Sequence, residues 1–147
     1  IQTAFEEEPE TAYVSIHEHP SFSYPGTGWA EEKGIGAGKG TILNLPLSPG
    51  AGPEQVLRLF PKIRSFLDLV QPEVLIVGAG FDAHREDDLS GLAFTVDLYR
   101  QLGVFVMELA RDYTEGRLLS ILEGGYCLEK LGSCVEAYLS GLVEKDA

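Results

Sequence analysis

The sequence predicts an α/β protein in which helices flank a parallel sheet. Strand-like and helix-like segments alternate along the 147 residues, and this alternation favours right-handed βαβ crossovers and parallel strand pairing. Residues 74–77 read Val-Leu-Ile-Val. A continuous apolar run of this kind is typical of a parallel strand that is buried on both faces. Three of the predicted strands are followed directly by residues that can perform chemistry.

The strands are predicted from short runs rich in β-branched and apolar residues. Ala12–Ile16 begins the series and ends just before a histidine. Thr41–Leu45 follows after a long glycine-rich segment. The run that contains residues 74–79 ends in two glycines, which permit a tight turn or a close approach of the backbone. Leu118–Leu122 completes the set.

Three helices are predicted from apolar residues that repeat with the helical period. The first covers residues 53–70 and starts at Pro53, because a proline suits the opening turn of a helix. Pro61 lies inside that segment and should kink or split it. The other helices are predicted at about residues 95–113 and 128–142.

Candidate site residues follow three of the strands. His17 and His19 come after the first strand, Asp82 and His84 after the third, and Glu123-Gly124-Gly125-Tyr126 after the last. The carboxyl ends of parallel strands meet at one edge of a sheet, so these residues are predicted to share a cleft. On this pattern alone Asp82 is either a metal ligand or general base, or a cap of the following helix.

Composition narrows the function classes. The net charge of −12 argues against binding to nucleic acid, which needs clusters of Lys and Arg. No apolar stretch approaches the roughly 20 residues of a membrane helix, so no membrane association is expected. Cys127 and Cys134 lie two turns apart on one predicted helix, too far apart for a disulfide. They are interpreted as free thiols, which favours a cytoplasmic location.

Six segments stand out when they are taken in order along the chain. They are Val14-Ser15-Ile16-His17, Tyr24-Pro25-Gly26-Thr27-Gly28, Gly38-Lys39-Gly40, Asn44-Leu45-Pro46, Gly80-Phe81-Asp82-Ala83-His84 and Glu123-Gly124-Gly125-Tyr126. Together they resemble the zinc-dependent histone deacetylases, most of all the bacterial members that include acetoin-utilisation proteins and acetylpolyamine amidohydrolases. The similarity covers almost the whole chain, and six ordered motifs are far more specific than any one of them.

This resemblance implies an arginase–deacetylase α/β fold and the hydrolysis of an acetylated amine, either acetyl-lysine or an acetylpolyamine. By position, Asp82 matches an aspartate ligand of the catalytic zinc. Tyr126 matches the tyrosine that hydrogen-bonds the substrate carbonyl and the oxyanion formed from it. The residues that match the wall of the substrate tunnel are Tyr24, Leu89, Gly124 and Gly125.

The resemblance also implies a structural monovalent cation, potassium being the natural candidate. The positions that match its binding region lie before and within the first strand. They are Phe5, Glu8, Thr11, Ser15 and Ile16.

The family's other two zinc ligands and its catalytic His-His pair have no matching segment here, because the resemblance places them upstream of the point that matches Ile1. Residues 1–147 are therefore expected to form the carboxyl-terminal part of a single deacetylase domain and to be inactive alone, with zinc absent or weakly bound. The alternative is a catalytically inactive fragment or pseudoenzyme module that serves binding or self-association.

A homo-oligomer is expected on physical grounds. A parallel sheet that lacks part of its fold exposes an edge strand with unpaired backbone groups, together with apolar helix faces. The strand at residues 12–16 is the predicted edge. A second copy of the chain would cover such surfaces.

Overall fold

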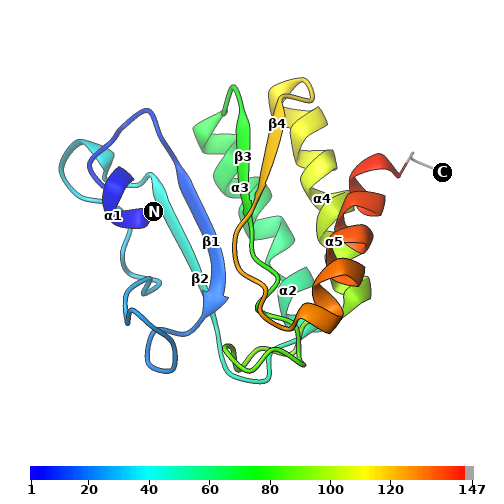
Figure 1. Ribbon diagram of the computed structural model, residues 1–147. Coiled ribbons are helices and arrows are strands. Elements are labelled where there is room, and N and C mark those ends of the chain that lie inside the picture. The colour runs from blue at the N-terminus through cyan, green and yellow to red at the C-terminus, as the bar shows by residue number, and fades with distance from the viewer. Residues whose placement is uncertain (145–147) are drawn as a thin grey trace.

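A computed structural model describes residues 1–144 of the chain (Figure 1). Two strands, β1 and β2, come before the first long helical segment, and helical segments and strands then alternate, as predicted. A short helix α1 and a 3-10 turn η1, which the sequence analysis did not predict, lie on either side of β1. The elements in chain order are α1 (Gln2–Phe5), β1 (Tyr13–Glu18), η1 (Gly36–Gly38), β2 (Ile42–Leu47), α2 (Pro53–Leu57), α3 (Phe60–Val70), β3 (Leu75–Ala79), α4 (Val96–Thr114), β4 (Leu118–Leu122) and α5 (Leu128–Val143).

The strands are parallel, but they form two separate pairs instead of one sheet. β1 pairs with β2 with Tyr13 opposite Ile42, and β3 pairs with β4 with Leu75 opposite Leu118. β1 and β3 lie next to each other in Figure 1, yet no backbone ladder joins the two pairs within the part of the chain that the structure describes. The predicted pairing direction is confirmed, whereas a continuous sheet is not.

Both strand pairs pack against a common set of helices. One buried cluster joins Leu45 of β2 to Ile63 and Leu67 of α3 and to Phe105 and Leu109 of α4. Half-buried side chains from β1, β2 and β3 pack on this cluster, namely Val14, Ile16, Leu43 and Leu75. The same hydrophobic core therefore fixes where the two pairs lie relative to each other.

The opposite face of β3 and β4 is exposed to solvent. Ile76 is 65% exposed, and Leu119 and Ile121 are 52% and 50% exposed. The register places Ile76 beside Leu119, so these side chains form one apolar patch. The prediction that residues 74–77 are buried on both faces is therefore wrong for this chain. The helices α3, α4 and α5 cover only one side of the strands, as Figure 1 shows.

Two prolines and a threonine explain where the helices begin. The predicted helix over residues 53–70 is split into α2 and α3. Pro61 lies in the first turn of α3, where its missing N–H costs no helical hydrogen bond. Helix α4 is capped by Thr95, whose hydroxyl accepts a hydrogen bond from the N–H of Leu98 at 3.2 Å.

Helices α4 and α5 pack closely through two glycines. A Cβ built on Gly103 would lie 3.1 Å from the Cα of Gly141 and would overlap the carbonyl oxygen of Tyr138. A Cβ on Gly141 would in turn overlap the carbonyl oxygen of Arg100. The two helix backbones can approach to this degree only because neither glycine has a side chain.

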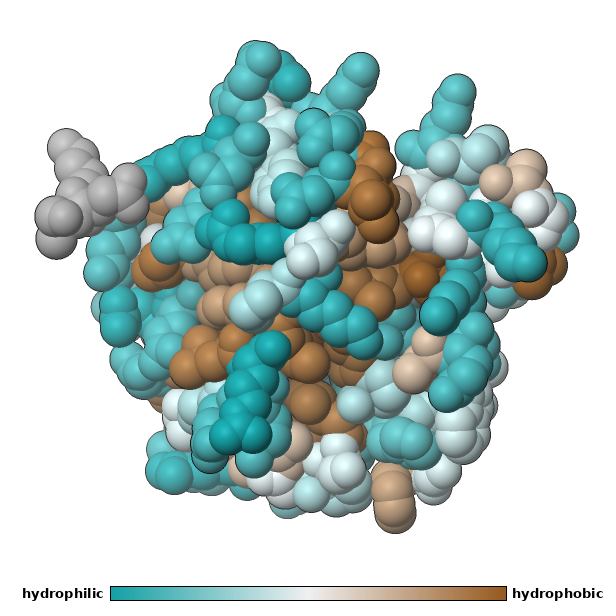
Figure 2. All heavy atoms as spheres, turned by 180° about the vertical axis from the view of Figure 1, so that it is seen from behind, coloured by the Kyte–Doolittle hydropathy of each residue, from teal (hydrophilic) through white to brown (hydrophobic). Residues whose placement is uncertain are grey.

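The helical side of the molecule has a shallow hollow between α2, α3 and α4. Figure 2 shows apolar atoms in the middle of this side with hydrophilic ones around them. The hollow has a volume of about 280 Å³, and its lining includes Leu57, Phe60 and Val104 beside Arg100 and Glu108. None of the helices within residues 1–144 is long and apolar enough to cross a membrane.

Candidate active site

The loops that follow β3 and β4 are joined by backbone hydrogen bonds. The N–H of Glu123 donates to the carbonyl of Ala79 at 3.0 Å, and the N–H of Phe81 donates to the carbonyl of Gly124 at 2.8 Å. These bonds continue the β3–β4 ladder beyond the ends of the two strands. They place the segment around Asp82 beside the segment that contains Tyr126.

Asp82 lies at the carboxyl end of β3, half-buried and close to Gly124. A Cβ on Gly124 would lie 2.7 Å from the carboxyl carbon of Asp82, so only glycine leaves room for this carboxylate. Burial and the nearby charge of Asp87 raise the pKa of Asp82 above its ordinary value. The alternative interpretation as a helix cap is excluded, because α4 starts at Val96 and is capped by Thr95.

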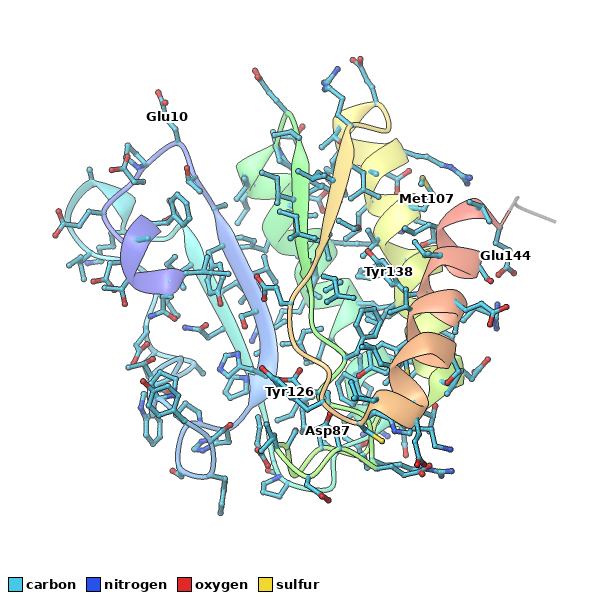
Figure 3. The ribbon with its side chains drawn as sticks, in the orientation of Figure 1. Glu10, Asp87, Met107, Tyr126, Tyr138 and Glu144 are labelled. Atoms are coloured by element: carbon cyan, nitrogen blue, oxygen red, sulfur yellow. The ribbon has the colours of Figure 1, made fainter. Side chains whose placement is uncertain are left out.

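Tyr126 lies on the loop between β4 and α5, at the same edge as Asp82. Its side chain is 59% exposed, so its hydroxyl is accessible to a ligand. Figure 3 shows Tyr126 and Asp87 next to each other where the ribbons of β3 and β4 end. The predicted placement of Tyr126 after residues 118–122 is confirmed, although its chemical role is not tested by this geometry.

Asp87 is a site residue that the sequence pattern does not identify, because it lies within the acidic run Glu86-Asp87-Asp88, whose composition suits a solvated loop. Asp87 is only 4% exposed. Its Oδ2 accepts hydrogen bonds from the N–H groups of Tyr126 at 2.7 Å and Cys127 at 2.9 Å. Its Oδ1 accepts from the N–H of Leu89 at 3.1 Å.

The ionisation of Asp87 follows from these contacts. Burial opposes the charged form, but the hydrogen bonds from Tyr126, Cys127 and Leu89 outweigh burial and lower the pKa of Asp87. The bond from Leu89, two residues on, is the pattern of an Asx turn, which was the one local signal available in the sequence.

His84 lies on the loop after β3 and is buried, at 3% exposure. Its Nδ1 accepts a hydrogen bond from the N–H of Glu86 at 3.2 Å, and burial lowers the pKa of its imidazole. His84 follows Asp82 by two residues, a spacing that could suggest paired ligands. Within residues 1–144, however, no three His, Cys, Asp or Glu side chains are grouped as a metal would need.

His17 organises the loop that follows β1. Its Nδ1 lies 2.8 Å from the hydroxyl of Ser15, and its Nε2 lies 2.8 Å from the carbonyl oxygen of Gly28. A Cβ on Gly28 would lie 2.5 Å from that Nε2. Through these contacts His17 orients the backbone of the loop.

The residues predicted for the substrate tunnel fall into two groups. Leu89, at 67% exposure, is connected to Tyr126 through Asp87. Gly125 adopts a φ of 138° and packs on Phe81. Tyr24 is instead 97% exposed and lines a separate hollow of about 300 Å³ beside β1, together with Ser15 and His17. The structure therefore brings Leu89, Gly124 and Gly125 to the Asp82 edge, but it does not place Tyr24 in one pocket with them.

The residues predicted for a monovalent cation are distributed along the chain before and within β1. The carbonyl of Phe5 accepts the N–H of Glu8 at 3.0 Å, and Thr11 is half-buried just before the strand. Ser15 and Ile16 pair in register with β2. These contacts neither assemble a cation site nor contradict one.

Comparisons with known proteins agree on one family. A family profile described as "Histone deacetylase domain" matches residues 1–142. The chain is 39% identical over 145 residues to "Histone deacetylase 14, chloroplastic" of Arabidopsis thaliana, covering 98% of this chain and 34% of that protein. It is 32% identical to "Acetoin utilization protein AcuC" of Bacillus subtilis, covering 86% of this chain and 33% of that protein.

The solved structures give the same result. An acetylpolyamine aminohydrolase from Burkholderia pseudomallei superposes with a TM-score of 0.87 at 30% identity, covering 95% of this chain and 40% of that one. The chain thus spans about a third of the length of the curated relatives that it matches. These comparisons do not support the further expectation that the match is the carboxyl-terminal half.

Proposed function

Because this chain belongs to the histone deacetylase family, we propose that it supplies part of the active site of a zinc-dependent deacetylase that hydrolyses acetyl-lysine or acetylpolyamines. The proteins that this chain resembles include a histone deacetylase, an acetoin utilization protein and an acetylpolyamine aminohydrolase. The observation that carries the proposal is the shared edge where Asp82 and the Tyr126 loop meet through two backbone hydrogen bonds.

The described residues fit the zinc only in part. Asp82 offers one half-buried carboxylate, which occupies the space that Gly124 leaves. A catalytic zinc takes three protein ligands and a water, so these residues do not make the site alone. We therefore assign the remaining ligands to parts of a longer protein, here called the complete deacetylase. When bound, the zinc polarises the amide carbonyl and activates water.

The chain's own contribution is to hold the substrate carbonyl. The phenol of Tyr126 carries a hydroxyl that is a hydrogen-bond donor. It can donate a hydrogen bond to the carbonyl oxygen and, as negative charge grows on that oxygen, stabilise it. Leu89 lies on the loop after β3, where its N–H donates to the carboxylate of Asp87. Its exposed side chain would contact the apolar stem of the substrate. Tyr24 would complete the tunnel from the β1 side once further segments are present.

A bound potassium ion near Phe5, Glu8, Thr11, Ser15 and Ile16 remains part of the proposal. Its effect would be structural, because these residues all precede or belong to β1. A monovalent cation held by backbone carbonyls would stiffen the connection between α1 and β1.

The test is zinc content and turnover in the complete deacetylase. Asp82→Asn should lower both, because the amide is a poor zinc ligand. Asp88→Asn is the matched control, since it removes the same charge from an exposed position in the same loop. Normal zinc content and turnover in Asp82→Asn would remove this carboxylate from the metal site and overturn the proposal.

A second candidate is a non-catalytic module that acts by binding or self-association. The bare apolar patch of Ile76, Leu119 and Ile121 favours it. We propose that in the isolated chain a second copy covers this patch or an unpaired strand edge, giving a homo-oligomer. The free thiols of Cys127 and Cys134 support a reducing location, for which we propose the cytoplasm.

A further inference from the structure

The proposed function assigns no role to the buried carboxylate of Asp87, although this carboxylate links the two loops of the site. It lies on the loop after β3, yet two of its three hydrogen bonds go to backbone N–H groups some 40 residues further along the chain. An ionised carboxylate at 4% exposure is costly to bury unless its partners compensate for lost water. Here three N–H donors do so.

The partners of Asp87 are specific to the Tyr126 loop. Oδ2 accepts from the N–H of Tyr126 itself at 2.7 Å and from that of Cys127 at 2.9 Å. Cys127 is also the residue that precedes α5, so the carboxylate lies at the positive end of that helix. Hydrogen bonds that backbone N–H groups donate to a charged acceptor are shorter and stronger than those donated to a neutral acceptor.

A second contact joins the same two segments, and it is weaker. Glu86 lies 3.2 Å from Lys130 on the first turns of α5, with both side chains more than a third exposed. An exposed ion pair of this kind contributes little to stability. Asp87 is therefore the principal side-chain link between the Asp82 loop and the Tyr126 loop among the described residues.

We propose that Asp87 is a positioning residue for Tyr126: its Oδ2 fixes the Tyr126 and Cys127 backbone, and thereby sets where the Tyr126 hydroxyl meets the substrate carbonyl. Because Leu89 donates to Oδ1 of the same carboxylate, the tunnel residue and the tyrosine are held by one group. The inference rests on the proposed role of Tyr126. It predicts that both residues lose their places together when Asp87 changes.

The first test is independent of catalysis. In Asp87→Asn the remaining oxygen is uncharged, and either the N–H of Leu89 or the N–H groups of both Tyr126 and Cys127 must face the side-chain amide instead of an oxygen. Amide hydrogen exchange at Tyr126 and Cys127 of this chain should then accelerate by about tenfold or more, since bonds to a charged acceptor are the strong ones. Amides of β4 should be unaffected, as should all of these positions in the Asp88→Asn control. Unchanged exchange at Tyr126 and Cys127 would overturn the proposal.

The second test is a double-mutant cycle in the complete deacetylase. Asp87→Asn should reduce kcat by about tenfold or more with KM and zinc content little changed, because displacing a reacting group by about 1 Å can cost up to about 10²-fold. In the Tyr126→Phe background the same change should cost almost nothing further, because the group that Asp87 positions is already gone. Independent, multiplying effects would indicate general destabilisation and contradict positioning. If Tyr126→Phe alone has no effect, the proposed function fails, while the exchange result still decides what Asp87 holds.

Discussion

Asp82 carries an electrostatic cost at the scale of a single residue. Its carboxylate is half-buried, and the neighbouring charge of Asp87 adds repulsion, so its pKa is raised. A carboxyl whose pKa is higher in the folded state favours folding only below its unfolded value, about 3.9. That contribution disappears as the pH rises through the folded value. At neutral pH the ionised Asp82 therefore destabilises this chain, as expected of a group placed for a ligand.

Asp82→Asn should accordingly raise the melting temperature of the chain at pH 7. The gain should shrink as the pH falls through the raised pKa of Asp82, because the wild-type carboxyl is then protonated as well. Thermal unfolding followed by circular dichroism at several pH values measures this. Asp88→Asn, at an exposed position, should leave the melting temperature nearly unchanged. A lower melting temperature for Asp82→Asn at pH 7 would show that the carboxylate is stabilising.

Asp87 has the opposite pH dependence. Its folded pKa is lowered by the three backbone hydrogen bonds despite burial. The stability that it contributes is fully present above the unfolded value of about 3.9 and is lost as the pH falls through the lower folded value. Asp87→Asn should therefore destabilise the chain at pH 7 and have a smaller effect in strong acid. Chemical denaturation of the wild type and of Asp87→Asn at pH 7 and in strong acid measures the difference in unfolding free energy. An equal loss of unfolding free energy under both conditions would contradict this role of Asp87.

At the scale of elements, the α4–α5 contact depends on glycine. Gly103→Ala should push the helices apart, because the added Cβ would meet the carbonyl of Tyr138. Overpacking of this kind costs about 1–3 kcal/mol. The matched control is Gly132→Ala on α5, where a Cβ meets nothing within 4 Å. That control should gain up to about 1 kcal/mol from helix propensity. Urea denaturation of both variants tests the contact, and equal stabilities would refute it.

Much of the element order could be predicted, because local signals coincide with the fold. The proline at position 61 marks the break between α2 and α3, and the apolar period of the segment beyond Thr95 gives α4 almost completely. The sheet could not be predicted in this way. An apolar run such as residues 74–77 indicates that both faces of the strand can be buried. It does not indicate whether this chain contains the elements that would pack on both faces. Ile76 is exposed for that reason.

From its strand pattern, the sequence could predict only those site residues that lie directly after a strand. A residue that directly follows a parallel strand, such as Asp82 or Tyr126, is placed at the edge by the strand itself. Asp87 could not be found from the same rule, because it lies five residues beyond Asp82 and its partners come from another loop. Its burial depends on tertiary contacts with the loop before α5, and the local Asx turn with Leu89 does not reveal those contacts.

At the scale of the whole molecule, the exposed surfaces predict self-association of the chain. The apolar patch on β3 and β4 is uncovered within residues 1–144. The edge of β1 that does not pair with β2 faces β3 in Figure 1, so the predicted exposed edge at residues 12–16 is replaced by this patch as the main surface. Light scattering should therefore find a dimer or larger assembly at micromolar concentration. Ile121→Lys, in the patch, should shift the population toward monomer. Leu69→Lys is the control, because Leu69 is 84% exposed on α3, away from the patch. A stable wild-type monomer would contradict the proposal.

The isolated chain should also be inactive, because Asp82 alone cannot hold a catalytic zinc with three protein ligands. An assay with an acetyl-lysine peptide and added zinc should give no turnover. Turnover by these 147 residues would show that the chain already contains a complete site.

The central claim is that Tyr126 acts on the substrate carbonyl at the edge it shares with Asp82, and removal of one hydroxyl tests it most directly. Tyr126→Phe in the complete deacetylase keeps the ring and the backbone bonds to Asp87 while deleting the donor. Turnover of an acetylated substrate should fall by about 10²–10³-fold, as loss of one oxyanion donor typically costs, with zinc content unchanged. Turnover equal to that of the wild type would contradict the claim.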